Sequence, residues 1–121
     1  MQEWRNNMSK VNIISILENK NTKEIIKNNI KGIVNDNIIN YIDNNTKVNI
    51  KINDSIIMTR KEEDSEIIFE FKELKNTKCI YKIYNKILEL NIYTNKIVKG
   101  DNYLEIDYNI EEEKLNFRIE W

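Results

Sequence analysis

The chain contains no histidine, and this absence restricts its chemistry more than any other feature of its composition. Histidine is the most common general base and metal ligand in proteins. Without it, the Ser-His and Cys-His pairs that activate nucleophiles are excluded. Proline and alanine are also missing, and the 121 residues include only 2 glycines. The lack of alanine shifts the local preference from helix toward strand.

Cysteine occurs once, at Cys79, so the chain has neither a disulfide framework nor a paired-cysteine zinc or redox motif. A single unpaired cysteine is typical of a reducing compartment, and we expect a cytoplasmic protein that needs no metal or cofactor. The neighbours Ile80 and Tyr81 indicate an ordinary strand residue rather than a reactive thiol.

Neither sign of charge dominates, because 19 basic residues face 20 acidic ones and the net charge is −1. This balance gives no electrostatic reason to expect a nucleic-acid partner or an anionic membrane. No apolar run approaches the ~20 residues of a membrane-spanning helix, and the polar first ten residues do not resemble a signal peptide. We expect residues 1–9 to form a disordered tail and residues 10–121 to form one domain.

What the chain has in abundance is alternation of apolar and other residues with a period of two. The clearest runs are Leu88, Leu90 and Ile92 leading to Thr94, then Leu104, Ile106, Tyr108 and Ile110, then Leu115, Phe117, Ile119 and Trp121. A period of two places each run on one face of a strand. The short polar turns between the runs predict an antiparallel meander with one buried face.

The earlier part of the chain repeats this pattern. It predicts strands over residues 11–18, 23–34, 38–43, 47–52, 56–61, 65–71, 78–84 and 88–96, before the last two runs. Clusters such as Asn35-Asp36-Asn37 supply the left-handed residues of hairpin turns, and Gly32 is typical of a bulge or a barrel bend. About 8–10 strands with hairpin-length connections predict an all-β fold, a closed antiparallel up-and-down barrel without exposed edges.

A set of residues in the second half of the chain supports this fold by their order and spacing. They are Arg60, Phe71, Thr77, Tyr81, the segments Leu90-x-Ile92-x-Thr94 and Leu104-x-Ile106-x-Tyr108, and Asn116, with Tyr41 and Asp43 before them. In this arrangement, residues 10–121 resemble the YwiB-like family of small bacterial proteins of unknown function. The resemblance implies a calycin-like (lipocalin-type) β-barrel and transfers no catalytic residue. The chain departs from the family at Asn85-Lys86, where glycine is usual, but asparagine adopts the same backbone conformation.

The interior of such a barrel holds either side chains or one small ligand. Parity directs a set of apolar residues inward: Leu88, Leu90, Ile92, Ile106, Ile110, Leu115, Phe117 and Ile119. Thr94 and Tyr108 share these faces, and so does Arg60 if Ile56 and Met58 point inward. Apolar walls with a few polar groups are typical of small-molecule sites. We therefore predict a non-enzymatic barrel that binds a small, partly apolar ligand through Arg60, Thr94, Tyr108 and Tyr81, with no catalytic or metal site.

Ordinary structural roles are the alternatives for these polar residues. Arg60 then extends to solvent or pairs with Glu70 or another carboxylate at the barrel rim. Tyr81 and Tyr108 then bury their rings and bond their hydroxyls to the backbone.

Two other function classes stay open. An interaction module would bind a protein, or less favourably RNA, through its outer surface, where Tyr84 lies near Lys82 and Lys86 and Tyr93 lies near Lys96. An enzyme would use paired carboxylates, which the runs Glu62-Glu63-Asp64 and Glu111-Glu112-Glu113 supply. Both acidic runs lie between strands, where such runs are usually solvated loops.

Overall fold

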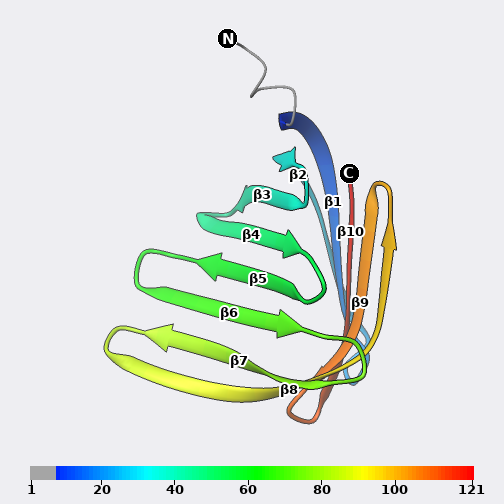
Figure 1. Cartoon of the computed structure of the whole chain (residues 1–121). Helices are drawn as coiled ribbons and strands as arrows, with labels where there is room; N and C mark the ends of the chain where they lie inside the picture. Colours follow the sequence, from blue (N-terminus) through cyan, green and yellow to red (C-terminus); the bar gives the residue numbers. More distant parts are fainter. Residues whose placement is uncertain (1–7) are drawn as a thin grey trace.

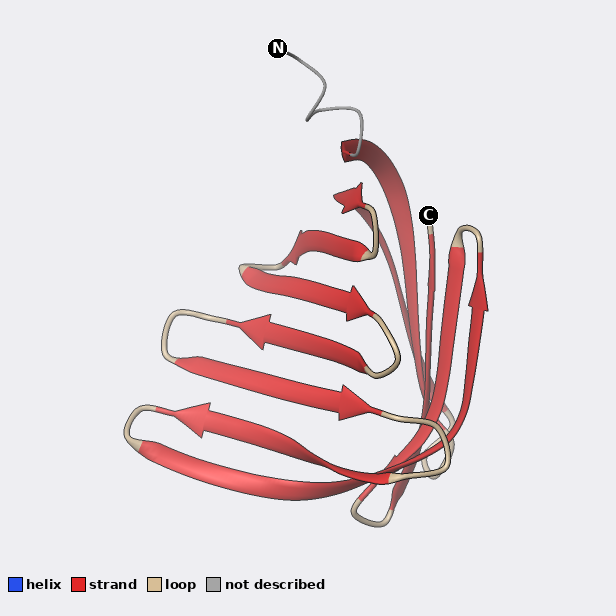
Figure 2. Ribbon diagram, in the orientation of Figure 1, coloured by secondary structure: helices blue, strands red, loops and turns tan. Residues whose placement is uncertain are grey.

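The computed structural model describes residues 8–121, and every regular element in that range is a strand (Figure 2). The ten strands are β1 (Met8–Asn19), β2 (Glu24–Asn35), β3 (Ile38–Asp43), β4 (Thr46–Ile52), β5 (Ile56–Lys61), β6 (Ser65–Phe71), β7 (Asn76–Ile83), β8 (Lys86–Gly100), β9 (Tyr103–Ile110) and β10 (Glu113–Glu120). Each strand pairs antiparallel with the strand before it, and β10 pairs with β1. The predicted closed up-and-down barrel is confirmed. The described residues contain no helix with the length and apolarity that a membrane crossing requires.

The prediction of a disordered tail falls on residues 1–7, which lie outside the described range. Met8 and Ser9, which that prediction also included, belong to β1 and pair with Asn35 and Val34 of β2. The folded region therefore begins at least two residues earlier than the sequence pattern indicates.

The barrel is built from two layers whose strands cross, as Figure 1 shows for β3 to β7 against β1, β9 and β10. The 15-residue strand β8 belongs to both layers, because its first part pairs with β7 and its second part with β9. A register shift between Thr94 and Lys96 marks a bulge, and bulges bend the strand that carries them. The β6–β7 loop covers this bend, where the Ile97 N–H donates to the Glu73 carboxylate at 2.8 Å. The predicted strand ended at Lys96, but β8 continues to Gly100.

β2 is also shared between the layers, and its change of neighbour occurs at Gly32. It pairs with β1 along its whole length, but with β3 only from Gly32 to Asn35. The register is continuous on both sides, so Gly32 does not mark a bulge. Its role is close approach, since a Cβ atom there would lie 2.6 Å from the Asn40 carbonyl oxygen and closer still to the Ile13 side chain.

The interior is packed toward one end of the barrel. The β2–β3, β4–β5, β6–β7 and β8–β9 turns surround this packed end, and the other five turns surround what we call the open end. The fully buried apolar side chains are Ile13, Ile39, Ile50, Ile56, Phe71, Ile92, Leu104, Ile106 and Ile119, with Val48 and Cys79 nearly so. Most of them lie in the parts of their strands nearer the packed end, which leaves the open end less filled.

Two details of the predicted pattern are corrected. Leu88 was assigned to the interior, but its side chain is 56% exposed because this part of β8 extends beyond the packed core. The left-handed residue of the β7–β8 turn is Tyr84, with φ of 53°, and not Asn85. Asparagine or aspartate supplies the positive φ in two turns, through Asp36 between β2 and β3 and through Asn44 and Asn45 between β3 and β4. In other turns the positive φ belongs to Lys23, Leu74 and Glu111.

Candidate ligand-binding cavity

A cavity of about 430 Å³ occupies the open end of the barrel. Its walls come from seven strands and the β3–β4 turn. Its apolar lining consists of Leu17, Ile26, Met58, Ile67, Phe69, Phe117 and the ring of Tyr108, and its polar lining of Ser15, Asn28, Asp43, Asn44 and Arg60. This volume falls within the ~300–1,000 Å³ that small-molecule sites occupy. The interior is therefore packed at one end and hollow at the other.

The cavity reaches a seam between β2 and β3. Among residues 8–121, the segment 24–31 of β2 pairs with β1 alone, because β3 joins β2 only from Gly32 onward. Asn28 of β2 and Asp43 of β3 face each other across this seam, and the Asn28 amide donates to the Asp43 carboxylate at 3.2 Å. This side-chain hydrogen bond therefore joins β2 and β3 at a place where their backbones do not pair.

Arg60 lies half-buried in the wall of this cavity. It is on β5 between Val48 of β4 and Ile67 of β6, with the same inward parity as Met58. The ion pairs among residues 8–121 are Lys20–Asp107, Lys82–Glu66 and Arg118–Glu120, so none of the described carboxylates pairs with Arg60. Glu70 pairs across the strands with Ile57, on the opposite face of the sheet, and does not reach Arg60.

The carboxylate in the cavity lining and the one that directly follows β5 are both held by neutral donors. Asp43 accepts from the Asn28 amide, and Glu62, just after β5, accepts from the Thr46 hydroxyl at 2.8 Å. Hydrogen bonds to neutral donors satisfy these oxygens without neutralising their charge. The cavity wall therefore carries a guanidinium whose charge no described carboxylate compensates by direct contact.

Two buried phenols lie near Arg60. Burial raises the pKa of Tyr108 far above its usual value, although the positive charge of Arg60 opposes the shift. Burial also raises the pKa of Tyr41, opposed by Arg60 and by a hydrogen bond with Ser15. Both phenols therefore keep their protons and can donate. The Tyr108 ring is fixed by Phe71, whose ring centroid lies 4.7 Å away at an interplanar angle of 59°.

The structure brings together Arg60 and Tyr108 of the four predicted site residues. Thr94 is fully buried beside Tyr108 on the neighbouring strand and does not line the cavity. Its hydroxyl has no hydrogen-bond partner among residues 8–121. Tyr81 is half-buried on β7, next to Ile67, and also lies outside the lining.

Sequence reasoning missed Ser15, Asn28 and Asp43 as cavity residues. Ser15 had a usable signal, because it shares the parity of Ile13 and Leu17 and so points inward with them. The sequence gives no such signal for Asn28 and Asp43, because their proximity depends on the point at which β3 separates from β2.

Cys79 does not add chemistry to the cavity. It is buried, and burial raises the pKa of its thiol to about 11, so the thiolate is scarce at neutral pH. Within residues 8–121, no three acidic or cysteine side chains are grouped so that they could hold a metal ion.

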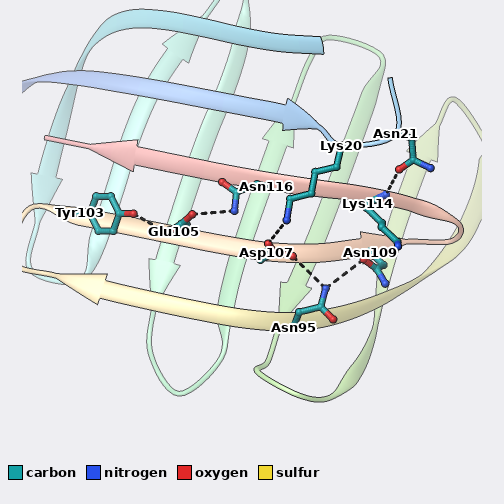
Figure 3. Close-up of polar contacts among 9 residues, drawn as sticks. All are labelled: Lys20, Asn21, Asn95, Tyr103, Glu105, Asp107, Asn109, Lys114 and Asn116. Atoms are coloured by element: carbon teal, nitrogen blue, oxygen red, sulfur yellow. Dashed lines mark hydrogen bonds and ion pairs between the residues drawn. The ribbon is translucent and has the colours of Figure 1, made fainter. Parts of the chain in front are cut away.

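A second polar cluster covers the outer face of β8, β9 and β10 (Figure 3). The Tyr103 hydroxyl donates to Glu105 at 2.7 Å, Asn116 donates to the other Glu105 oxygen at 3.0 Å, and Lys20 lies 2.5 Å from Asp107. The Tyr103 hydrogen bond is the main reason that the pKa of Glu105 is lowered. Because these donors and acceptors are occupied by one another on a sheet face, we assign the cluster a structural role.

Comparison with known proteins identifies a family without an activity. A family model described as "Domain of unknown function (DUF1934)" matches residues 11–118. Among solved structures, the fold is similar to that of the ywiB protein from Bacillus subtilis, with 19% sequence identity, a TM-score of 0.68, and coverage of 94% of this chain and 93% of that chain. At this identity the similarity shows the fold alone. No curated protein matches the chain.

Proposed function

The chain belongs to the DUF1934 family, and from its own geometry we propose that it is a non-enzymatic barrel protein that binds a small, partly apolar ligand in its open end. The observation that carries this proposal is the cavity of about 430 Å³, with apolar walls and one half-buried arginine that pairs with no described carboxylate. A packed interior would have given no room for a ligand. Convergent polar groups on apolar walls are the usual composition of such sites.

Native mass spectrometry of the protein purified from its own host tests this proposal. We expect a reproducible non-covalent adduct that disappears on denaturation. The adduct should also be lost after extraction with an organic solvent and refolding, because a partly apolar ligand partitions out of water. If repeated preparations with high protein recovery gave only the mass calculated from the sequence, without an adduct, this result would contradict the proposal.

The same proposal includes the finer expectations from the sequence. A calycin-like barrel is supported by the single meander that closes on itself. A cytoplasmic location is supported by the unpaired, buried Cys79, which fits a reducing compartment. A bacterial origin is supported by the similarity of the fold to that of a Bacillus subtilis protein.

A second candidate function is association through the outer surface, which the β7–β8 hairpin favours. Ile83, Tyr84, Ile87 and Leu88 are 37%, 77%, 67% and 56% exposed, so four large apolar side chains cluster at one tip. Such clusters commonly mark protein interfaces. The other tyrosine named in the sequence prediction, Tyr93, is half-buried rather than exposed, and it belongs to a different part of β8.

The partner that this tip fits best is a second copy of the chain. Residues 86–91 of β8 pair with β7 and with no other strand among residues 8–121, which leaves a strand edge available (Figure 1). A symmetric antiparallel pairing of two such edges places a residue opposite its own copy, because neighbouring residues of a strand point to opposite faces of the sheet. Centred on Leu88, the pairing places the two exposed Leu88 side chains opposite each other.

A charge at the twofold position tests this pairing. We expect Leu88→Lys to weaken dimerisation about tenfold, because it places two like charges opposite each other. Leu74→Lys, at an exposed leucine of the β6–β7 loop, is the control and should leave the dimerisation constant unchanged. Sedimentation equilibrium gives the dimerisation constants. A monomeric wild-type chain at all accessible concentrations, or equal constants for the three proteins, would contradict this arrangement.

A further inference from the structure

The charge of the cavity wall points to the chemistry of its ligand. Arg60 is half-buried in an apolar wall, and the carboxylate in the same lining, Asp43, accepts from the Asn28 amide and forms no ion pair with Arg60. None of the described groups accepts a hydrogen bond from the Arg60 guanidinium, and an anion that binds beside it gains charge-assisted hydrogen bonds, which are stronger than bonds between neutral groups. Guanidinium and carboxylate also match in geometry, because two parallel N–H groups meet two oxygens.

We propose that the ligand is a small apolar molecule with one ionised carboxylate, which binds the Arg60 guanidinium while its apolar part lies against Met58, Ile67 and Phe69. This inference rests on the proposed function, since it names the ligand class of the same cavity. The hydroxyl of Tyr108, in the same lining, is a protonated donor that can serve the carboxylate next to Arg60. The carboxylate end therefore points toward β5 and β9.

The negative charge of Asp43 opposes this attraction, so changing Asp43 provides a second test of the ligand class. Its carboxylate lines the same cavity from the β3 side, where it repels a bound anion. Removing the charge of Asp43 should therefore strengthen anion binding, whereas removing the charge of Arg60 should weaken it. Neither change should alter the binding of a neutral ligand with the same apolar part.

The experiment is a calorimetric titration of the full chain, freed of bound material by solvent extraction and refolding, with decanoate, decanol and decylammonium at neutral pH. These probes share one chain and differ in the head group. We expect decanoate to bind about tenfold or more tightly than decanol, because a hydrogen bond to a charged group favours it. Decylammonium should bind most weakly. Arg60→Met should abolish the preference for decanoate, and Asp43→Asn should raise decanoate affinity severalfold without changing that of decanol.

Arg118→Met is the matched control, because Arg118 lies on the outer face over the Tyr103 ring, 5.3 Å from its centroid, and the substitution removes the same charge. It should leave the preference for decanoate intact. Equal binding of decanoate and decanol to the wild-type chain, or a preference that survives Arg60→Met, would overturn the carboxylate assignment while the ligand-binding function stands. Tightest binding of decylammonium would assign the selectivity to Asp43 and overturn it as well. Failure of all three probes to bind would overturn both the assignment and the proposed function.

Discussion

Replacing Gly32 with alanine should destabilise the barrel by about 2–3 kcal/mol, which corresponds to a fall in Tm of about 10 °C. A Cβ atom at this position would lie 2.6 Å from the Asn40 carbonyl oxygen and would also overlap the Ile13 side chain. The carbonyl belongs to β3, so relief requires β2 and β3 to separate where they begin to pair. Urea unfolding followed by tryptophan fluorescence measures the change.

Gly100→Ala is the control for this prediction. Gly100 ends β8, and the nearest atom to an added Cβ there is the Tyr103 Cβ at 3.4 Å, an ordinary contact. Glycine-to-alanine replacement without strain stabilises by about 0.4–1 kcal/mol through the unfolded chain. The two variants should therefore change stability in opposite directions. If Gly32→Ala were as stable as the wild type, the close approach of β2 and β3 at this corner would not be a determinant of the fold.

The strands and most of the turns were predictable because their signals are local. Alternation identifies a strand and its inner face, and the buried Ile106, Phe117 and Ile119 lie where parity placed them. Asparagine and aspartate mark hairpin turns because their side chains tolerate positive φ, as at Asp36 and Asn44.

The sequence-based predictions were wrong at places where the two layers meet. Alternation of apolar residues does not encode how far a strand extends past the opposite layer. Leu88 has the inward parity but lies on a part of β8 that extends past the opposing layer, so it stays more than half exposed. The bulge at Asn95 did have a local signal, because the parity of the apolar residues changes between Ile92 and Ile97.

The candidate site was predictable only in part for the same reason. Arg60 and Tyr108 follow from parity on their own strands. Asn28 and Asp43 meet because β2 leaves β3 at Gly32, and the length of a pairing between two strands is a tertiary property. Thr94 was predicted from the same parity, but it lies at a depth where the core is already packed.

Replacing Ser15 with phenylalanine should weaken the binding of decanol or decanoate about 100-fold. Ser15 is on the inner face of β1 and lines the cavity. An aromatic ring there occupies part of the 430 Å³ and excludes several methylene groups of the ligand. At about 0.8 kcal/mol for each buried methylene, the loss of three or four accounts for this factor. Titration with the same probes measures it.

Ser15→Ala is the matched control, because it loses the same hydroxyl but adds no volume. It should bind the probes within about threefold of the wild type. The phenylalanine variant should be more stable than the alanine variant by about 1 kcal/mol, because its ring fills apolar space. A variant that simply folds badly loses stability and binding together, whereas blocking the site lowers binding while stability rises. Unchanged binding by Ser15→Phe would therefore place the ligand outside the barrel.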